Sequence, residues 1–311
     1  MVKSMRVILI TGDGLGHRYV ANRMAAEMPL AGIIVDHGRS IRRVERMLRL
    51  IRRYSPAQLL SRAMWALVSR IWRDEAASER AMLAVLGPEN CSHFSHPNLL
   101  HHVHGINTPE GIGAVSSLDP DVILVFGTGI VGKQVLSRAR KTALNMHTGI
   151  SPYYRGCDCY FWPLYNRELH MLGATVHECV REIDGGRIFA TTGIELQPDD
   201  DLFMVFARCI SAGADLYVKK VRELADHDLS GTTQDLSIGT EYKAHQKGFL
   251  AEWKVRRAIQ GGLVRQFVGT PVAIPRDSVR PLHPVKQEGP SAGMKSENSV
   301  RVDVPSGAHK K

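Results

Sequence analysis

Two short apolar runs lie near the start of the chain, with a glycine turn and an apolar-periodic segment between them. The runs span residues 7–10 and 31–35. Three glycines follow the first run, and in residues 19–28 apolar side chains recur at helical spacing. Strand, turn, helix and strand in this order predict the βαβ unit of a parallel sheet. We therefore expect an α/β fold with a Rossmann-like, mostly parallel sheet flanked by helices.

The glycine turn has three interpretations. It is a tight structural turn, a contact for an anionic substrate group through Gly12, Gly14 and Arg18 with help from His17, or a dinucleotide site. The third is the weakest, because the glycine spacing is wrong and Asp13 would repel a pyrophosphate. The first two stay open.

Further strands and helices follow from the same patterns. The predicted strands cover residues 99–103, 122–126, 143–147, 173–180 and 187–196, and the predicted helices cover residues 108–118, 133–138 and 160–165. The three aspartates at 199–201 are expected to cap a long helix that reaches about residue 225.

Residues 39–85 interrupt the sheet pattern and predict three helices, the first two joined at Ser55-Pro56. Leu60, Met64, Leu67, Val68 and Ile71 recur at helical spacing in the second. Residues 39–73 contain ten arginines and one glutamate, so this segment accounts for the whole net charge of +9. Three interpretations of the insert stay open. It forms a solvated basic face over a core-packing stripe, or it forms a lid or channel wall that attracts an anionic substrate. In the third, it contacts an acidic membrane surface or nucleic acid.

The rest of the composition is that of an ordinary globular protein. Of the 311 residues, 44% are hydrophobic, no apolar run is long enough for a membrane span, and no secretory signal is visible. Five scattered cysteines imply no disulfide framework, so we expect a reducing cytoplasm. From residue 270 onward, Pro, Ser, Gly and Lys dominate and predict a disordered tail to residue 311.

The most informative motif is an ordered set of polar residues in the middle of the chain. Asn145 and His147 alternate by two, which places both side chains on one face of a strand. A loop, residues 151–156, contains a proline and ends in Arg155-Gly156, and Asp184 precedes two glycines. An amide and an imidazole on one face can hold a carbonyl oxygen as it gains negative charge, and the carboxylate can set the state of the imidazole and accept a proton.

This set resembles the formyltetrahydrofolate-dependent formyltransferases, as do residues 121–130 and 133–136. One departure is that the loop after His147 reads Gly149-Ile150-Ser151-Pro152, where the family usually has two leucines before the proline. The resemblance implies catalysis by Asn145, His147 and Asp184 without a metal, with protonated His147 beside the oxyanion, and 10-formyltetrahydrofolate as the formyl donor. The implied folate-binding residues are Thr128, Gly129, Ile130, Val131, Arg181, Glu182 and Ile183.

The resemblance also implies a domain organisation and a set of acceptors. Residues 1–200 would form the catalytic domain with the basic insert, and residues 201–269 a helical subdomain. The favoured acceptor is the amine of a small or nucleotide-activated molecule, such as an amino sugar, whose anionic groups Arg155 contacts unless it only stabilises its turn. A tRNA acceptor is disfavoured, because the resemblance implies that tRNA formyltransferases carry a β-barrel domain after the catalytic domain. The 127 residues after Asp184 show no run of alternating strands for such a barrel.

Other functions remain as alternatives. A glycinamide ribonucleotide formyltransferase and a hydrolase that releases formate from the same folate would use the same residues, and a non-catalytic protein would bind partners through the basic helices. A homo-oligomer, and peripheral membrane contact by the insert, stay open. The Cys157-x-Cys159 pair has poor spacing for zinc. The histidines between 93 and 104, with Cys91, lie mostly in a loop or beside a strand and are interpreted as surface histidines, so no metal site is expected.

Overall fold

A computed structural model describes residues 5–38, 54–227 and 230–269, which all fall within one compact unit. The first predicted insert helix, seven of the ten insert arginines and the predicted tail lie outside the described residues.

Seven strands form the main sheet in the order β3-β2-β1-β4-β5-β7-β8. Their bounds are β1 (Val7–Thr11), β2 (Leu30–Asp36), β3 (Leu100–Val103), β4 (Val122–Phe126), β5 (Thr142–His147), β7 (Gly173–Glu178) and β8 (Ile188–Gly193). The first five in that order pair in parallel, whereas β7 pairs antiparallel with both β5 and β8. The predicted α/β fold with a mostly parallel sheet is confirmed.

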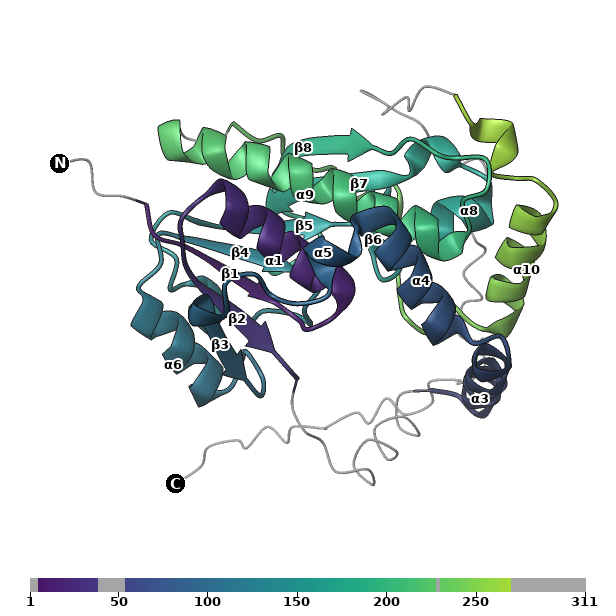
Figure 1. Cartoon of the computed structure of the whole chain (residues 1–311), viewed down its shortest axis with the longest axis horizontal. Helices are drawn as coiled ribbons and strands as arrows, with labels where there is room; N and C mark the ends of the chain where they lie inside the picture. Colours follow the sequence, from purple (N-terminus) through teal and green to yellow (C-terminus); the bar gives the residue numbers. More distant parts are fainter. Residues whose placement is uncertain (1–4, 39–53, 228–229, 270–311) are drawn as a thin grey trace, which may run out of the picture. The chain divides into compact units, whose positions relative to one another are not determined.

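Helices cover both faces of this sheet, and the alternation of side chains along the strands explains why (Figure 1). Val7 and Leu9 of β1 face one core, together with α1 (Leu15–Glu27), α4 (Asp74–Leu86) and α9 (Leu202–Asp226). Ile8 and Ile10 face a second core with α6 (Pro109–Leu118) and α7 (Lys133–Leu136). Every residue of β1 and β4 is buried, as expected for strands covered on both sides.

The long helix α9 begins as predicted. The Asp201 side chain accepts hydrogen bonds from the backbone N–H groups of Phe203 and Met204, each at 2.8 Å, and so satisfies two donors at the helix start. Tyr217 of α9 donates its hydroxyl hydrogen to the Leu144 carbonyl at 2.7 Å. The helix is thereby fixed against β5, and residues on both sides of the predicted boundary at 200 pack together. The division into residues 1–200, 201–269 and 270–311 as domains with separate roles stays a prediction.

The region after residue 230 is not wholly helical, in contrast to the prediction. Residues 240–242 form β9 (Thr240–Tyr242), which pairs in parallel with β6 (Tyr154–Gly156) in a separate two-stranded sheet. A strand of three residues is too short to show a period in the sequence, and its pairing with a segment more than 80 residues away defines it. Helix α10 (Phe249–Gln260) and the short helix η3 (Arg265–Phe267) follow.

Helix α3 (Pro56–Ile71) corrects a second prediction. Ser55 caps it and exchanges hydrogen bonds with Gln58, so the helix begins where Ser55-Pro56 predicted. However, no residue of α3 is buried, and its apolar stripe therefore does not pack in the core. The remaining short elements are α5 (Pro88–Cys91), α8 (Trp162–Asn166), η1 (Pro97–Leu99) and η2 (Leu169–Met171). Within the described ranges, no helix is long and apolar enough to cross a bilayer.

Candidate active site

Strand β5 carries Asn145 and His147 at its carboxyl end, beside the antiparallel strand β7. Asn145 lies opposite His177, and His147 lies opposite Thr175. The loop between β7 and β8 brings Asp184 to the same place. His147 and His177 are buried, and only 12% of the Asp184 side chain is exposed. The three residues predicted to be catalytic are therefore neighbours, although 39 positions separate the outer two.

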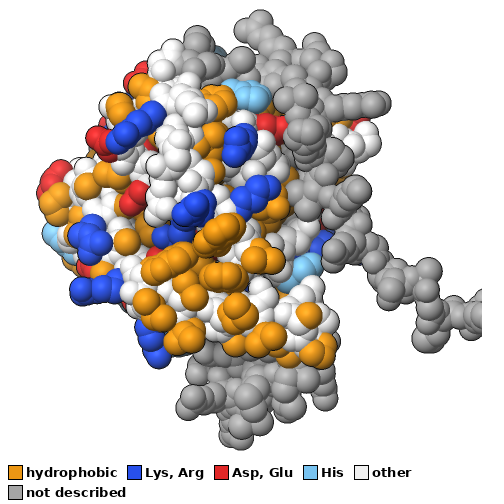
Figure 2. All heavy atoms as spheres, turned by 90° about the vertical axis from the view of Figure 1, so that its right-hand side faces the viewer, with side chains coloured by type: hydrophobic (Ala, Val, Ile, Leu, Met, Phe, Trp, Pro, Cys, Tyr) orange, Lys and Arg blue, Asp and Glu red, His pale blue; other side chains and the backbone are white. Residues whose placement is uncertain are grey.

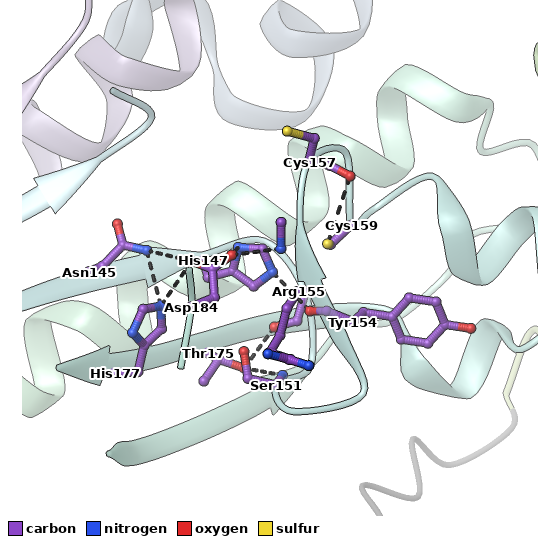
Figure 3. A network of polar contacts seen from close by, with 12 residues as sticks. Asn145, His147, Ser151, Tyr154, Arg155, Cys157, Cys159, Thr175, His177 and Asp184 are labelled. Atoms are coloured by element: carbon purple, nitrogen blue, oxygen red, sulfur yellow. Dashed lines mark hydrogen bonds and ion pairs between the residues drawn. The ribbon is translucent and has the colours of Figure 1, made fainter. Parts of the chain in front are cut away.

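These side chains form one polar cluster around the Asp184 carboxylate (Figure 3). Asp184 Oδ2 lies 3.4 Å from His147 Nδ1, and Oδ1 lies 3.3 Å from His177 Nε2. Asn145 Nδ2 lies 3.1 Å from His177 Nε2 and 3.4 Å from Asp184 Oδ1. On the other side of its ring, His147 Nε2 lies 3.0 Å from the Tyr154 carbonyl oxygen. In this state the amide N–H groups of Asn145 contact the cluster itself, so an oxyanion would have to compete for them.

The backbone around Asp184 explains why a carboxylate precedes two glycines. Asp184 adopts a left-handed conformation with φ of 48°, which Asp tolerates better than most residues. A Cβ atom at Gly186 would lie 2.0 Å from the Glu178 carbonyl oxygen, so only glycine fits there. The Gly156 N–H donates to Asp184 Oδ2 at 2.8 Å, and the Gln234 side-chain amide donates to the Asp184 carbonyl at 2.7 Å. Two distant loops thus fix the carboxylate.

Burial and mutual attraction both shift the pKa values of Asp184 and His147. Burial alone would raise the pKa of Asp184, but His147, His177 and the Gly156 amide together hold this pKa well below its usual value. Burial lowers the pKa of His147, and the attraction of Asp184 only partly opposes that effect. This direction favours the neutral form of His147, and the protonated ring that the resemblance implied stays a prediction.

Gly149, in the loop that follows β5, lies directly against His147. A Cβ atom at Gly149 would lie 2.6 Å from His147 Nε2 and 2.5 Å from the Cβ of Cys159. The loop stays anchored, because Thr175 Oγ1 donates to the Gly149 carbonyl at 2.7 Å and accepts from the Ser151 N–H at 3.1 Å. Glycine at this position therefore leaves room for the imidazole.

A cleft of about 1270 Å³ opens above the cluster and is lined by Asn145, His147 and Asp184. The loop after β4 and the loop after β7 form one half of it. Ile130, Val180 and Ile183 are 76%, 38% and 42% exposed there, and exposed apolar side chains in a cleft are suited to a flat aromatic ligand. All the residues predicted to bind folate line this cleft, namely Thr128, Gly129, Ile130, Val131, Arg181, Glu182 and Ile183.

In the other half of the cleft, acidic side chains outnumber basic ones. Glu75 and Glu79 of α4 line it together with Asp13 and Glu241 of β9, and Lys243 lines it as well. Arg18 also lines the cleft, but Asp13 pairs with it at 2.8 Å and offsets its charge. The part of the insert that reaches the cleft is thus acidic.

The glycine turn after β1 positions His17. The Gly14 N–H donates to His17 Nδ1 at 3.2 Å, and His17 Nε2 lies 3.1 Å from the Gly127 carbonyl oxygen. Burial, the largest effect, lowers the pKa of His17. Gly12 lies against the same ring, with a Cβ position 3.2 Å from Nε2. These contacts support the structural interpretation of the turn, and Gly14 and Arg18, but not Gly12, line the cleft.

Arg155 is buried away from the cleft. Its guanidinium donates to the Pro152 carbonyl at 3.1 Å and to the Leu236 carbonyl at 3.0 Å. These bonds support the alternative in which Arg155 stabilises its turn. The following residue, Gly156, has φ of 91° and comes so close to β9 that a Cβ atom would lie 2.2 Å from the Tyr242 carbonyl oxygen.

Three contributions to the site were missed by sequence reasoning. His177 contacts both Asn145 and Asp184, Gln234 holds the Asp184 loop, and β9 supports the Arg155-Gly156 turn. For His177, the only indication in the sequence was its position seven residues before Asp184. The five cysteines form no disulfide with one another, and no cluster of three or more metal-ligating side chains occurs among the residues that the structure describes.

Known proteins are similar in sequence to the part of the chain that carries this polar cluster. Residues 88–221 match the family model described as formyl transferase. The methionyl-tRNA formyltransferase of Chlorobium chlorochromatii is 29% identical over 141 residues, 45% of each chain, and that of Thermotoga maritima is 30% identical over 136 residues, 43% of each chain. The chain thus matches less than half the length of these relatives.

Solved structures of similar proteins include two formyltransferases. A 4-N formyltransferase from Francisella tularensis is 14% identical with a TM-score of 0.48 and covers 78% of both chains. The phosphoribosylglycinamide formyltransferase of Anaplasma phagocytophilum is 16% identical with a TM-score of 0.48 and covers 75% of this chain and 94% of its own. Both TM-scores are below 0.5, so the similarity to formyl transferases depends on the sequence match of residues 88–221.

Proposed function

We propose that this protein transfers a formyl group from 10-formyltetrahydrofolate to the amine of a small acceptor. The observation that carries the proposal is the position of Asn145, His147 and Asp184 in one cleft that has an apolar half and an acidic half. A donor with a flat ring system fits the apolar half, where Ile130 and Ile183 are exposed. The acceptor then approaches the polar cluster from the other half.

In this proposal, the donor supplies a formyl carbon, and the cluster handles charge and proton. The amine forms a bond to that carbon, and negative charge develops on the formyl oxygen, where the Asn145 amide donates a hydrogen bond. The neutral ring of His147 takes up the proton that the amine loses, because the developing negative charge then favours the imidazolium. Asp184 stays ionised and stabilises that imidazolium at a distance of 3.4 Å. The bond between the formyl carbon and the donor nitrogen then breaks, and the proton passes from His147 to that nitrogen.

The acidic half of the cleft narrows the choice of acceptor. Glu75 and Glu79 would repel a phosphate, whereas carboxylates accept hydrogen bonds from hydroxyl groups and ammonium groups. We therefore favour an amino sugar or another hydroxylated amine over a phosphate-bearing acceptor, and do not assign phosphate recruitment to the insert. A methionyl-tRNA acceptor is the second candidate, because the sequence relatives named above are methionyl-tRNA formyltransferases.

The test is an acceptor screen with the full chain and 10-formyltetrahydrofolate. Mass spectrometry would detect the gain of one formyl group on amino sugars, on their nucleotide-linked forms, on glycinamide ribonucleotide or on methionyl-tRNA. Formylation of an uncharged amino sugar that Asp184→Asn abolishes supports the proposal. Formylation of methionyl-tRNA alone supports the second candidate, and formate release without any amine would replace both with a hydrolase.

A further inference from the structure

Helix α3 presents an apolar stripe to solvent. Leu60, Met64, Leu67 and Ile71 recur at three- and four-residue spacing, which puts them on one side of the helix. They are 64%, 43%, 62% and 67% exposed, and no residue of the helix is buried. A helix face of this composition is normally buried, so its exposure indicates a surface that something covers.

The face of α3 next to the stripe is held against α10, which fixes the direction of the stripe. The Phe249 N–H at the start of α10 donates to Ser61 Oγ at 3.4 Å. The Arg256 guanidinium of α10 lies 5.6 Å from the ring centre of Trp65 and 4.9 Å from that of Trp72. It also pairs with Asp74, at the start of α4, at 3.0 Å. The stripe faces outward because the face of α3 beside it is already engaged.

Helix α10 adds apolar and basic side chains beside α3. Leu250 and Trp253 are 74% and 48% exposed, and Lys254 and Arg257 are exposed on the same turns of the helix. Figure 2 shows hydrophobic side chains gathered on the face that carries α3 and α10, with Lys and Arg side chains along the border. We call these exposed side chains, together with the stripe and Arg70 and Arg73, the α3–α10 surface.

The charges of this surface have one sign. Helix α3 contains no acidic residue, and the only acid in α10, Glu252, is 2% exposed and paired with Lys247. A second copy of the chain would bring like charges together, and nucleic acid would use the basic residues but leave the apolar stripe in water. An anionic lipid surface satisfies both, because apolar side chains enter the acyl boundary while Arg and Lys contact the headgroups.

We propose that the α3–α10 surface binds membranes that contain anionic lipids, with α3 lying in the plane of the interface. Trp253 fits this position, since indole rings favour the boundary between headgroups and acyl chains. Helix α4, which follows α3 directly, lines the acidic half of the cleft. Membrane contact would therefore hold the cleft near the lipid surface, but the proposal does not depend on the reaction performed there.

Co-sedimentation of the full chain with lipid vesicles tests the proposal. We expect binding to vesicles rich in phosphatidylglycerol and little binding to vesicles of phosphatidylcholine alone. The double variant Leu60→Asn with Leu67→Asn should weaken binding at least about tenfold, because each leucine loses apolar area that enters the lipid. Replacing Arg70, Arg73 and Arg257 by Gln should weaken it by at least about tenfold, and added salt should weaken it too.

Matched controls separate membrane contact from damage to the fold. Ala63→Asn with Ala66→Asn introduces the same residues at exposed positions of α3 but removes only methyl groups, so vesicle binding should persist. Lys133→Gln, Arg138→Gln and Lys141→Gln remove the same charge from exposed positions outside the surface, and binding should persist there as well. Equal binding to both kinds of vesicle, binding to neither, or equal loss in variant and control would overturn the proposal. An acidic protein as the true occupant would appear as the absence of vesicle binding.

Discussion

Carboxylates are held in opposite ways in two regions of this molecule. At the end of β5, Asp184 keeps its charge, because two imidazoles and the Gly156 amide lower its pKa by more than burial raises it. Where α4 meets α10, burial raises the pKa values of Asp74 and Glu252 despite the nearby cations Arg256 and Lys247. At Asp184 the attraction of His147 and the hydrogen bonds from His177 and Gly156 together outweigh burial, whereas the cations near Asp74 and Glu252 do not.

Hydrogen bonds account for the contrast. Asp184 accepts from the Gly156 N–H and lies within 3.4 Å of three side-chain nitrogens. Both oxygens of Asp74 and one oxygen of Glu252 are buried without a hydrogen-bond partner, so their ion pairs lack good donor geometry. The first arrangement is suited to chemistry, and the second fixes helices.

The largest expected effect is on catalysis. In a formylation assay with the accepted amine, His147→Asn should reduce kcat about 10²- to 10³-fold or more, because it removes the group that receives the proton and stabilises the oxyanion. Asp184→Asn tolerates the same left-handed backbone but removes the charge, and we expect a comparable loss. Circular dichroism should show both variants folded. Near-normal turnover in either folded variant would remove the polar cluster from the mechanism.

Next in size is the loss of the cation that joins α3, α4 and α10. Arg256→Gln should destabilise the protein by roughly 2–3 kcal/mol in urea unfolding, since it leaves Asp74 and Glu252 buried with less compensation. Arg257→Gln, one position on, removes an exposed charge over Trp253 and should cost less than about 0.5 kcal/mol. If both variants were equally stable, the contrast between the two regions would lose its energetic basis.

The pH dependence of the reaction reports on His147. Because burial lowers its pKa, the neutral ring should persist below the ordinary value, and kcat/KM should fall only as the pH drops below about 6.5. Asp184 opposes that lowering, so Asp184→Asn should move the falling limb to still lower pH in whatever activity remains. A limb well above pH 6.5 in the wild type would instead support a ring that is protonated before the reaction.

Acid titration of stability compares the two regions directly. The depressed pKa of Asp184 contributes stability that is present above about pH 4 and is lost as the pH falls below that value. The raised pKa values of Asp74 and Glu252 act in the opposite direction, since protonation at low pH relieves their burial. Between about pH 5 and pH 3, Asp184→Asn should therefore lose less stability than the wild type, and Glu252→Gln should lose more. Identical slopes would contradict the contrast.

The sequence predicted more of the polar cluster around Asp184 than of the insert that contains α3 and α4. Asn145, His147 and Asp184 belong to a short ordered set, so the sequence predicted that they meet. The first two share β5, and the loop after β7 brings Asp184 to them. His177 and Gln234 escaped notice, because their contacts depend on an antiparallel strand and on a loop 50 residues away from Asp184.

The insert was predicted less completely for a physical reason. Helical spacing gives an apolar face but does not say what covers it, so a stripe packed in the core was one of three open interpretations of the insert. The position of α3 depends on Arg256, which comes some 190 residues later in the chain, and on Ser61, neither of which alters the local period. In the same way, the acidity of the cleft depends on the residues of α4 that face it, not on the net charge of the insert.

The smallest expected effect is the loss of stability when exposed leucines of α3 are replaced, and a buried leucine of β5 provides the reference. Leu144 of β5 is fully buried, and Leu144→Ala should destabilise the protein by about 2–5 kcal/mol. Leu60→Asn with Leu67→Asn replaces two exposed leucine side chains of α3. It should cost only about 1 kcal/mol, because Asn is a poorer helix former than Leu. Ala63→Asn with Ala66→Asn should cost the same or slightly more in the same urea titration, because Ala is the better helix former. A cost for the leucine variant well above that of the alanine variant would mean that the stripe packs against part of its own chain, and the surface would then not be free to bind lipid.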